Sequence, residues 1–455
     1  MIFTSINPAT GETIEEYPAT SDGEVDQILT DAAKAQADWR RTDFAHRADL
    51  MRRAGEILQD RSRELGELMT REMGKPVRDA VSEAEKCAWV CDYYAEGAAD
   101  FLAAEEVETD ASRSLVTYRP LGTILAIMPW NFPFWQVFRF AAPNLMAGNA
   151  GLLKHAPNVP GCALAIEDVF HEAGFPPGLF RTLLVGEATA GDVIDDDRVQ
   201  GVTLTGSVGA GRAVASRAGE RIKKTVLELG GSDPYLVLED ADLDAAAKTC
   251  VTSRLINSGQ SCIAAKRFIV VERVADEFTR KVVERMNEAV VGDPMDESTD
   301  VGPQARDDLR DALHDQVERS VAGGARVALG GELPHGPGYF YPPTVLTGIN
   351  PGTPAWEEEL FGPVASVITV ADEAEAIRVA NDPPYGLGAA VFTSDAERGE
   401  RIATEELEAG CCFVNDFVRS DPRLPFGGIK DSGYGRELSP HGIREFVNVK
   451  TVWVA

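Results

Sequence analysis

Residues 121–155 read LGTILAIMPWNFPFWQVFRFAAPNLMAGNAGLLKH. The apolar runs Thr123–Met128 and Gly151–Lys154 predict two buried strands, and Trp135–Ala147 between them has the length and composition of a helix. A strand, a helix and a second strand in this order form a βαβ unit with parallel strands. The stretch therefore predicts an α/β fold whose ligands bind outside the carboxyl ends of the strands.

The same alternation continues along the chain. Before this stretch, residues 32–99 repeat apolar residues at spacings of three and four, which is typical of helices. After it, we expect strands at Thr182–Val185 and Val202–Thr205, and helices at Pro160–Ala173, Ala188–Asp195 and Val208–Ala218. A second α/β series follows, with strands at Tyr235–Leu238, Arg267–Val271, Ala365–Val370, Ala389–Phe392 and Cys412–Asn415 and a helix at Leu243–Asn257.

Two further segments alternate like strands but belong to no βαβ unit. They are Ser114–Arg119 and Phe446–Val454. Because an unpaired strand edge is a liability, such strands often pair with a partner subunit. The two segments therefore favour a homo-oligomer.

Composition excludes several classes of protein. The 455 residues are 44% apolar and contain no apolar stretch near the ~20 residues that span a bilayer, which excludes an embedded membrane protein. The charge is 44 − 73 = −29, with no basic patch, so nucleic acid and anionic membranes are not expected partners. Only 11 of the basic residues are lysines, and the evenly acidic chain suggests a halophilic source.

The cysteines and histidines indicate which compartment and which classes of enzyme to expect. The seven cysteines are odd in number and lack paired spacing, and the N-terminus shows no secretion signal, so we expect a reducing cytoplasm. The six histidines show no metal-binding spacing, and there is no GxxxxGK[ST] loop. Metal enzymes and nucleotide-triphosphate enzymes are therefore disfavoured.

Two residues are candidates for catalysis. Cys262 lies in the segment Asn257–Ala264, whose small polar residues leave room for a ligand at the sulfur. Glu228 ends an apolar strand beside Gly230 and Gly231, where burial can raise the pKa of a general base. The alternatives are a small core cysteine and a strand-end charge that reaches water.

Three more positions suit a bound cofactor or a developing charge. Gly206 and Ser207 follow a strand and open a helix, where free N–H groups bind phosphate, although a plain tight turn fits equally well. Asn131, between two prolines, can donate to an oxyanion or cap the next helix. Lys154 ends its strand and can bind ribose or phosphate, or simply be solvated.

Seven motifs taken in order resemble the aldehyde dehydrogenase superfamily, and the likeness covers almost the whole chain. They are Pro129–Pro133, Lys154, Gly206-Ser207, Glu228–Gly231, Gly259–Cys262, Glu359–Pro363 and Pro425–Gly428. The resemblance implies a Rossmann-like NAD(P)-binding domain at 1–108 and 122–228 and a catalytic domain at 229–425. It also implies oligomerisation strands at 109–121 and 436–455, in a homodimer or homotetramer.

The resemblance implies a reaction as well. The Cys262 thiolate attacks an aldehyde, and the Asn131 amide and the Cys262 N–H hold the resulting oxyanion. Hydride leaves for the nicotinamide, and Glu228 activates the water that hydrolyses the thioester. The cofactor contacts implied are Trp130 and Lys154 for adenosine, Gly206 and Ser207 for pyrophosphate, Glu359 for the nicotinamide ribose and Phe361 for the nicotinamide. Glu437 matches a carboxylate near the proton exit, with a solvated loop charge as the alternative.

Cofactor and substrate preference are less constrained. Pro157 stands where many NAD-preferring relatives place a glutamate, so NAD or NADP is expected. The segment Lys154–Pro160 resembles succinate-semialdehyde dehydrogenases, whose carboxylate contacts match Arg139 and Ser420. The alternative for Arg139 is a helix-surface residue in an ion pair. Ile256 replaces a second arginine of that pattern, so 2-oxoglutarate semialdehyde or an aliphatic aldehyde stays open.

Three rival functions are considered. Cys262 with Glu228 would suit a cofactor-independent hydrolase, although no histidine is placed to activate the thiol. A CoA-acylating dehydrogenase would keep Cys262 but has no need of Glu228. A non-catalytic scaffold has no need of either residue.

Overall fold

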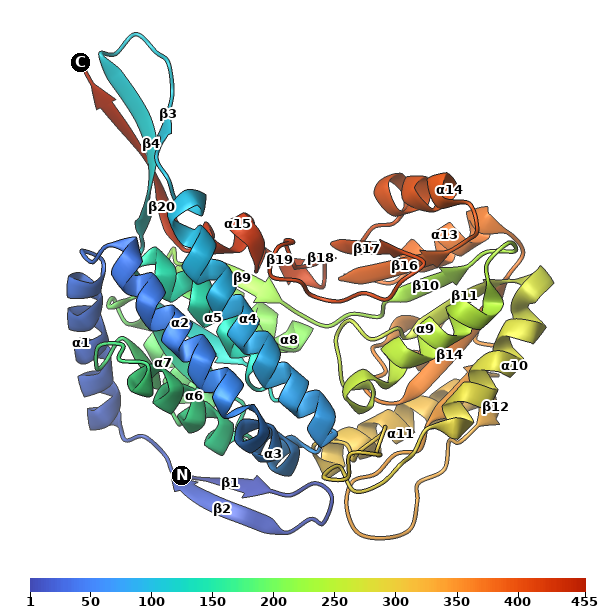
Figure 1. Ribbon diagram of the computed structural model, residues 1–455. Helices are drawn as coiled ribbons and strands as arrows, with labels where there is room; N and C mark the ends of the chain where they lie inside the picture. The colour runs from blue at the N-terminus through green and yellow to red at the C-terminus, as the bar shows by residue number, and fades with distance from the viewer.

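In the computed structural model, which describes all 455 residues, residues 121–155 form the βαβ unit predicted from the sequence (Figure 1). Strand β5 (Thr123–Met128) pairs in parallel with β6 (Ala150–His155), and helix α5 (Trp135–Ala147) connects them. Every residue of α5 is buried, because further helices cover it. The α/β fold class is therefore confirmed.

A six-stranded sheet contains this unit. Its order is β19 (Gly433–Tyr434), β9 (Lys224–Glu228), β8 (Val199–Thr205), β5, β6 and β7 (Phe180–Thr182). Helices α6 (Pro160–Glu172), α7 (Glu187–Asp195) and α8 (Val208–Glu220) connect the strands. The strand predicted at Thr182–Val185 is wrong in position, because β7 ends at Thr182, where the predicted strand begins. Leu183 and Val185 are buried in the core, but they lie after the end of the strand. The other strands and helices expected here agree within a few residues.

Four helices before the sheet account for the helical pattern of residues 32–99. They are α1 (Asp22–Trp39), α2 (Phe44–Asp60), α3 (Ser62–Met73) and α4 (Val77–Phe101). Helices α2 and α4 lie side by side across α5 and α6 (Figure 1). Together they enclose the largest apolar core of the molecule.

A seven-stranded sheet forms a second lobe. Its order is β12 (Arg326–Leu329), β13 (Thr344–Thr347), β14 (Val364–Val370), β11 (Arg267–Val271), β10 (Pro234–Val237), β16 (Gly388–Phe392) and β17 (Cys411–Val414). The helices of this lobe are α9 (Leu243–Leu255), α10 (Glu272–Glu288), α11 (Asp307–Ala322), α12 (Pro354–Glu357), α13 (Glu373–Asn381) and α14 (Ala396–Arg401). Five of the strands correspond to those predicted from apolar runs.

The two leftover strands pair with each other. Residue by residue, β20 (Val447–Val454) lies antiparallel to β4 (Arg113–Pro120), and β3 (Glu105–Glu106) adds a short third strand. The three strands form an arm that projects from the first lobe (Figure 1). Pairing between these strands within one chain was not expected from the sequence. The outer edge of β20 remains open.

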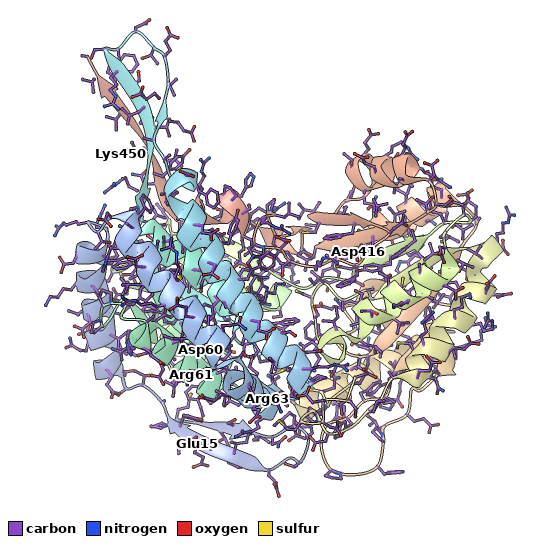
Figure 2. The ribbon with its side chains drawn as sticks, in the orientation of Figure 1. Glu15, Asp60, Arg61, Arg63, Asp416 and Lys450 are labelled. Carbon is purple, nitrogen blue, oxygen red and sulfur yellow. The ribbon has the colours of Figure 1, made fainter.

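Smaller elements complete the chain. They are the hairpin β1 (Ile2–Ile6) and β2 (Thr13–Pro18), the pair β15 (Tyr385–Gly386) and β18 (Ile429–Lys430), helix α15 (Ser439–Ile443), and the short turns η1 (Ile256–Gly259) and η2 (Ile402–Glu406). Charged side chains such as Asp60, Arg61 and Arg63 extend from the surface (Figure 2). None of the helices combines the length and the apolar character that a membrane span requires. The domain bounds given above stay a prediction.

Candidate active site

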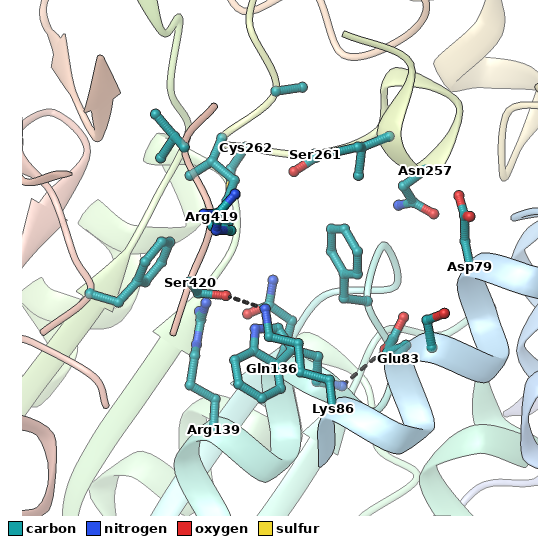
Figure 3. Close-up of a pocket in the computed structure, with 18 of the residues that line it drawn as sticks. Asp79, Glu83, Lys86, Gln136, Arg139, Asn257, Ser261, Cys262, Arg419 and Ser420 are labelled. Carbon is teal, nitrogen blue, oxygen red and sulfur yellow. Dashed lines mark hydrogen bonds between the residues drawn. The ribbon is translucent and has the colours of Figure 1, made fainter. Parts of the chain in front are cut away.

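A cavity of about 290 Å³ lies between the two lobes. Helices α4 and α5 supply one wall, and the segments around Cys262 and Ser420 supply the other (Figure 3). This volume is close to the lower limit of ~300 Å³ for small-molecule sites. The cavity therefore suits a ligand of a few carbon atoms.

A left-handed turn delivers the chain to Cys262. Helix α9 ends at Leu255, two residues earlier than predicted, because Asn257, Ser258 and Gly259 have φ values of 55°, 57° and 78°. Consecutive left-handed residues are rare and cluster at functional sites. A Cβ at Gly259 would lie 2.2 Å from the backbone carbon of Gly362, so the glycine is required for this close approach.

Buried cations hold this turn in place. Arg254 Nη2 donates to the carbonyl oxygen of Gly259 at 2.6 Å. Lys266 Nζ donates to the carbonyl oxygens of Ser261 and Cys262 at 2.9 and 2.6 Å. Hydrogen bonds from charged donors are roughly twice as strong as neutral ones. The backbone at Cys262 is therefore firmly positioned.

The thiol of Cys262 lines the cavity but is held in its neutral form. Burial raises its pKa to about 12, and the positive charges of Lys266 and Arg139 oppose that shift. The thiolate is the nucleophilic form. Cys262 therefore needs a change in its surroundings, or a proton acceptor, before it can attack.

Glu228 is buried at the end of β9 with neither carboxylate oxygen hydrogen-bonded. Burial, followed by repulsion from Glu437, raises its pKa well above the ordinary value, and Arg139 opposes this. One of its carboxylate oxygens would lie 2.5 Å from a Cβ at Gly427. A raised pKa suits a general base, but Glu228 does not line the cavity that contains Cys262.

Asn131 connects the exit of β5 to the cysteine segment. Its Nδ2 donates to the carbonyl oxygen of Gln260 at 3.1 Å, and its own carbonyl oxygen accepts from Asn257 Nδ2 at 2.7 Å. One of the two Asn131 amide hydrogens is left for another acceptor. This arrangement fits a donor to an oxyanion, and Asn131 does not cap α5.

Lys154, predicted for the adenosine half, and Gly206 and Ser207, predicted for the pyrophosphate, lie at the carboxyl edge of the first sheet. Lys154 Nζ has no hydrogen-bond or ion-pair partner, and burial lowers its pKa. Ser207 caps α8 by accepting from Ala210 N at 3.2 Å. A Cβ at Gly206 would meet only the Leu204 side chain, at an ordinary contact distance of 3.6 Å. A thirteen-residue helix with an open, uncrowded N-terminus suits an anion.

The residues predicted for the nicotinamide end lie between the lobes. The ring of Phe361 meets edge to face with the ring of Trp130, a residue predicted for the adenosine half, with centroids 5.7 Å apart. Glu359 Oε1 accepts from Gly231 N at 3.1 Å and lies 3.3 Å from Lys266 Nζ. Lys266 therefore connects the carboxylate predicted for the ribose to the segment that bears Cys262.

The two predicted substrate contacts, Arg139 and Ser420, line the same cavity as Cys262. Arg139 is buried, forms an ion pair with Glu437, and stacks 4.7 Å from the ring centroid of Phe426. The interpretation of Glu437 as a solvated loop charge is wrong, because the side chain is buried against Arg139.

Several lining residues escaped the sequence interpretation, and the chief of them lie on α4. Asp79, Glu83 and Lys86 line the cavity at spacings of four and three. That spacing places the three polar groups on one face of a helix that is otherwise largely buried. The sequence could have indicated these lining residues through this spacing. Ile256 also lines the cavity, whereas Arg254 is turned away from it and fully buried.

Comparisons with known proteins agree on one protein family. The model of the aldehyde dehydrogenase family matches residues 1–452. A probable succinate-semialdehyde dehydrogenase [NADP(+)] of Synechocystis sp. is 53% identical over 455 residues, with all of both chains covered. A succinate semialdehyde dehydrogenase [NAD(P)+] of Escherichia coli is 49% identical, with 99% of this chain and 97% of the relative covered.

A solved structure has the same fold. Succinic semialdehyde dehydrogenase from Streptococcus pyogenes, in complex with NADP+, matches with a TM-score of 0.97. It is 38% identical, and the match covers 99% of each chain. The likeness therefore extends over both lobes and the arm.

Proposed function

The chain belongs to the aldehyde dehydrogenase family, and we propose that it oxidises succinate semialdehyde to succinate with NADP+ as the preferred hydride acceptor. The observation that carries the substrate is the cavity, which places Cys262 opposite cationic and hydroxyl side chains that suit a carboxylate. Relatives named for this substrate, at about half identity over the full chain, support it.

The residues at the edge of the first sheet fit a dinucleotide. Lys154 offers an unpaired ammonium, and Gly206 and Ser207 offer an open helix N-terminus for pyrophosphate. Glu359 and Phe361 would lie at the nicotinamide end. When bound, the cofactor supplies the acceptor for the hydride that the substrate loses. No acidic side chain stands at Pro157 to repel a 2′-phosphate, which favours NADP+.

The protein's own residues then carry the chemistry. The Cys262 thiol gives up its proton to water, its sulfur forms a bond to the aldehyde carbon, and Asn131 Nδ2 and the Cys262 N–H donate to the oxyanion. The carbon loses its hydride with the electron pair, which leaves a thioester on Cys262. Glu228 takes a proton from water, the water oxygen attacks the thioester, the carbon–sulfur bond breaks, and the departing sulfur takes up the proton that Glu228 holds.

Assembly and location complete the proposal. Strand β20 has an open edge, and its Val449 and Trp453 side chains are 60% and 56% exposed, so we infer a homodimer or homotetramer that covers this strand. The seven free cysteines favour a reducing cytoplasm.

Initial rates test the function. Formation of reduced nicotinamide is measured with succinate semialdehyde, butanal and 2-oxoglutarate semialdehyde, each with NAD+ and with NADP+. Succinate semialdehyde with NADP+ should give the highest kcat/KM, and Cys262→Ala should lower the rate by at least about a thousandfold. A preference for an uncharged aldehyde would overturn the substrate, and ester cleavage without aldehyde oxidation would indicate the hydrolase instead.

A further inference from the structure

Three cationic side chains line the cavity, and two of them already have carboxylate partners. Arg139 pairs with the buried carboxylate of Glu437. Arg419 donates from Nη1 and Nη2 to the two oxygens of Asp416, at 3.2 and 2.7 Å. Lys86 forms no ion pair, because Glu83 and Asp421, the carboxylates that act on its charge, lie beyond ion-pair distance and pair with Lys75 and Arg423.

The ammonium of Lys86 is held at the cavity wall by neutral groups. Its Nζ donates to Ser420 Oγ at 2.9 Å and lies 4.3 Å from the centroid of the Trp135 ring (Figure 3). An ammonium has three hydrogens to donate, and only one is used here. Two donors of Lys86 therefore remain for a ligand next to Ser420.

The acidic side chains of the same wall form no ion pair with Lys86. Glu83 pairs with the buried Lys75 and accepts from the backbone N–H groups of Phe134 and Trp135, both at 2.9 Å. Asp79 lies one turn of α4 further away, beside Arg78 at 3.6 Å. Glu83 is therefore fully committed to other partners, and neither acid forms an ion pair with Lys86.

The protonation of Lys86 reflects this isolation. Burial, assisted by repulsion from Arg139, lowers its pKa to about 8. A buried cation without a counter-ion gains more from an arriving carboxylate than one that is already paired. Ile256, which lines the cavity on the second lobe, offers no competing charge.

We propose that Lys86, together with Ser420, is the principal anchor for the distal carboxylate of the substrate. Arg139 has a different part in this arrangement, because it is tied to Glu437 and acts mainly on the charges of Cys262 and Glu228. The proposal rests on the proposed function for the identity of the aldehyde. It adds a residue of α4 that determines specificity for a carboxylate-bearing substrate.

The test compares two aldehydes in matched variants. Lys86→Met, Lys86→Arg and the control Lys248→Met, which makes the same change at an exposed position of α9, are assayed with succinate semialdehyde and butanal. Lys86→Met should raise KM for succinate semialdehyde by about tenfold to a hundredfold with a smaller change in kcat, as expected for a lost charged hydrogen bond. Lys86→Arg should recover much of the loss, and Lys248→Met should match the wild type.

A second readout separates this proposal from the function. Succinate is titrated as an inhibitor of butanal oxidation, and its inhibition constant should rise in Lys86→Met by the same factor as KM. If the wild type does not oxidise succinate semialdehyde, the proposed function fails, and succinate inhibition still decides on Lys86. An unchanged KM and inhibition constant in Lys86→Met would overturn the anchor. Arg419→Met is the last comparison. If it raised KM and the inhibition constant as much as Lys86→Met does, the anchor would be overturned too, because any positive charge near the cavity would then have the same effect.

Discussion

The thiol of Cys262 combines a reactive position with an unreactive protonation state. It faces the cavity, yet burial outweighs the charges of Lys266 and Arg139. Because only the thiolate is nucleophilic, non-specific alkylation of Cys262 in the free enzyme is slow at neutral pH. The pKa of the thiol depends on the side chains that surround the sulfur in the folded protein. The segment Asn257–Ala264 alone could therefore identify the cysteine but could not give its pKa.

The raised pKa predicts how fast Cys262 is alkylated. Because the pKa is raised to about 12, the thiolate fraction is small at neutral pH and grows with each step towards alkaline pH. Below the pKa, the rate of iodoacetamide labelling of the free enzyme should rise about tenfold per pH unit. Peptide mass spectrometry measures the labelling, with Cys262→Ala as the control. A rate that levels off near pH 8 would show that the pKa is not raised.

Helix α4 positions parts of the site that lie far from it in the sequence. Glu83 accepts from the first N–H groups of α5 and pairs with the buried Lys75, and Lys86 one turn on reaches Ser420. Periodicity predicted the helix and most neighbouring strands, because apolar spacing is a local signal. The contacts of α4 with α5 and with Ser420 escaped prediction because they join residues more than fifty positions apart in the sequence.

Replacing Glu83 tests this role of α4. Glu83→Gln leaves the buried Lys75 without a counter-ion and weakens the N-terminal cap of α5, so the protein should lose about 3–5 kcal/mol of stability. Thermal and urea denaturation measure the loss. The control is Glu85→Gln, an exposed position on the same helix that forms no ion pair. Equal transition midpoints for the two variants would contradict this account of α4.

The whole molecule carries an excess of 29 negative charges, and many of its ion pairs lie on the surface. The site residues stay a prediction, but the alternation of strands and helices in both lobes was predictable, because apolar periodicity is a local signal. The pairing of β4 with β20 within one chain was not, because edge pairing depends on where the chain turns in space. The halophilic source stays a prediction that follows from the charge.

Salt should therefore stabilise the protein. Raising KCl shortens the screening length from about 10 Å at 0.1 M to about 3 Å at 1 M, which reduces repulsion among the unpaired carboxylates. We expect Tm to rise over this range, as measured by differential scanning calorimetry at constant pH. A Tm that falls with KCl would mean that the surface ion pairs outweigh the excess charge.

The chemistry proposed for Cys262 can be observed directly as its covalent intermediate. Glu228→Gln enzyme is mixed with succinate semialdehyde and NADP+, quenched in acid, digested and examined by mass spectrometry. Because the variant lacks the base that activates water, the peptide that contains Cys262 should gain the mass of one succinyl group, and Cys262→Ala should gain none. Steady turnover by the wild type, with no succinyl group on Cys262 in the Glu228→Gln enzyme, would contradict the thioester mechanism.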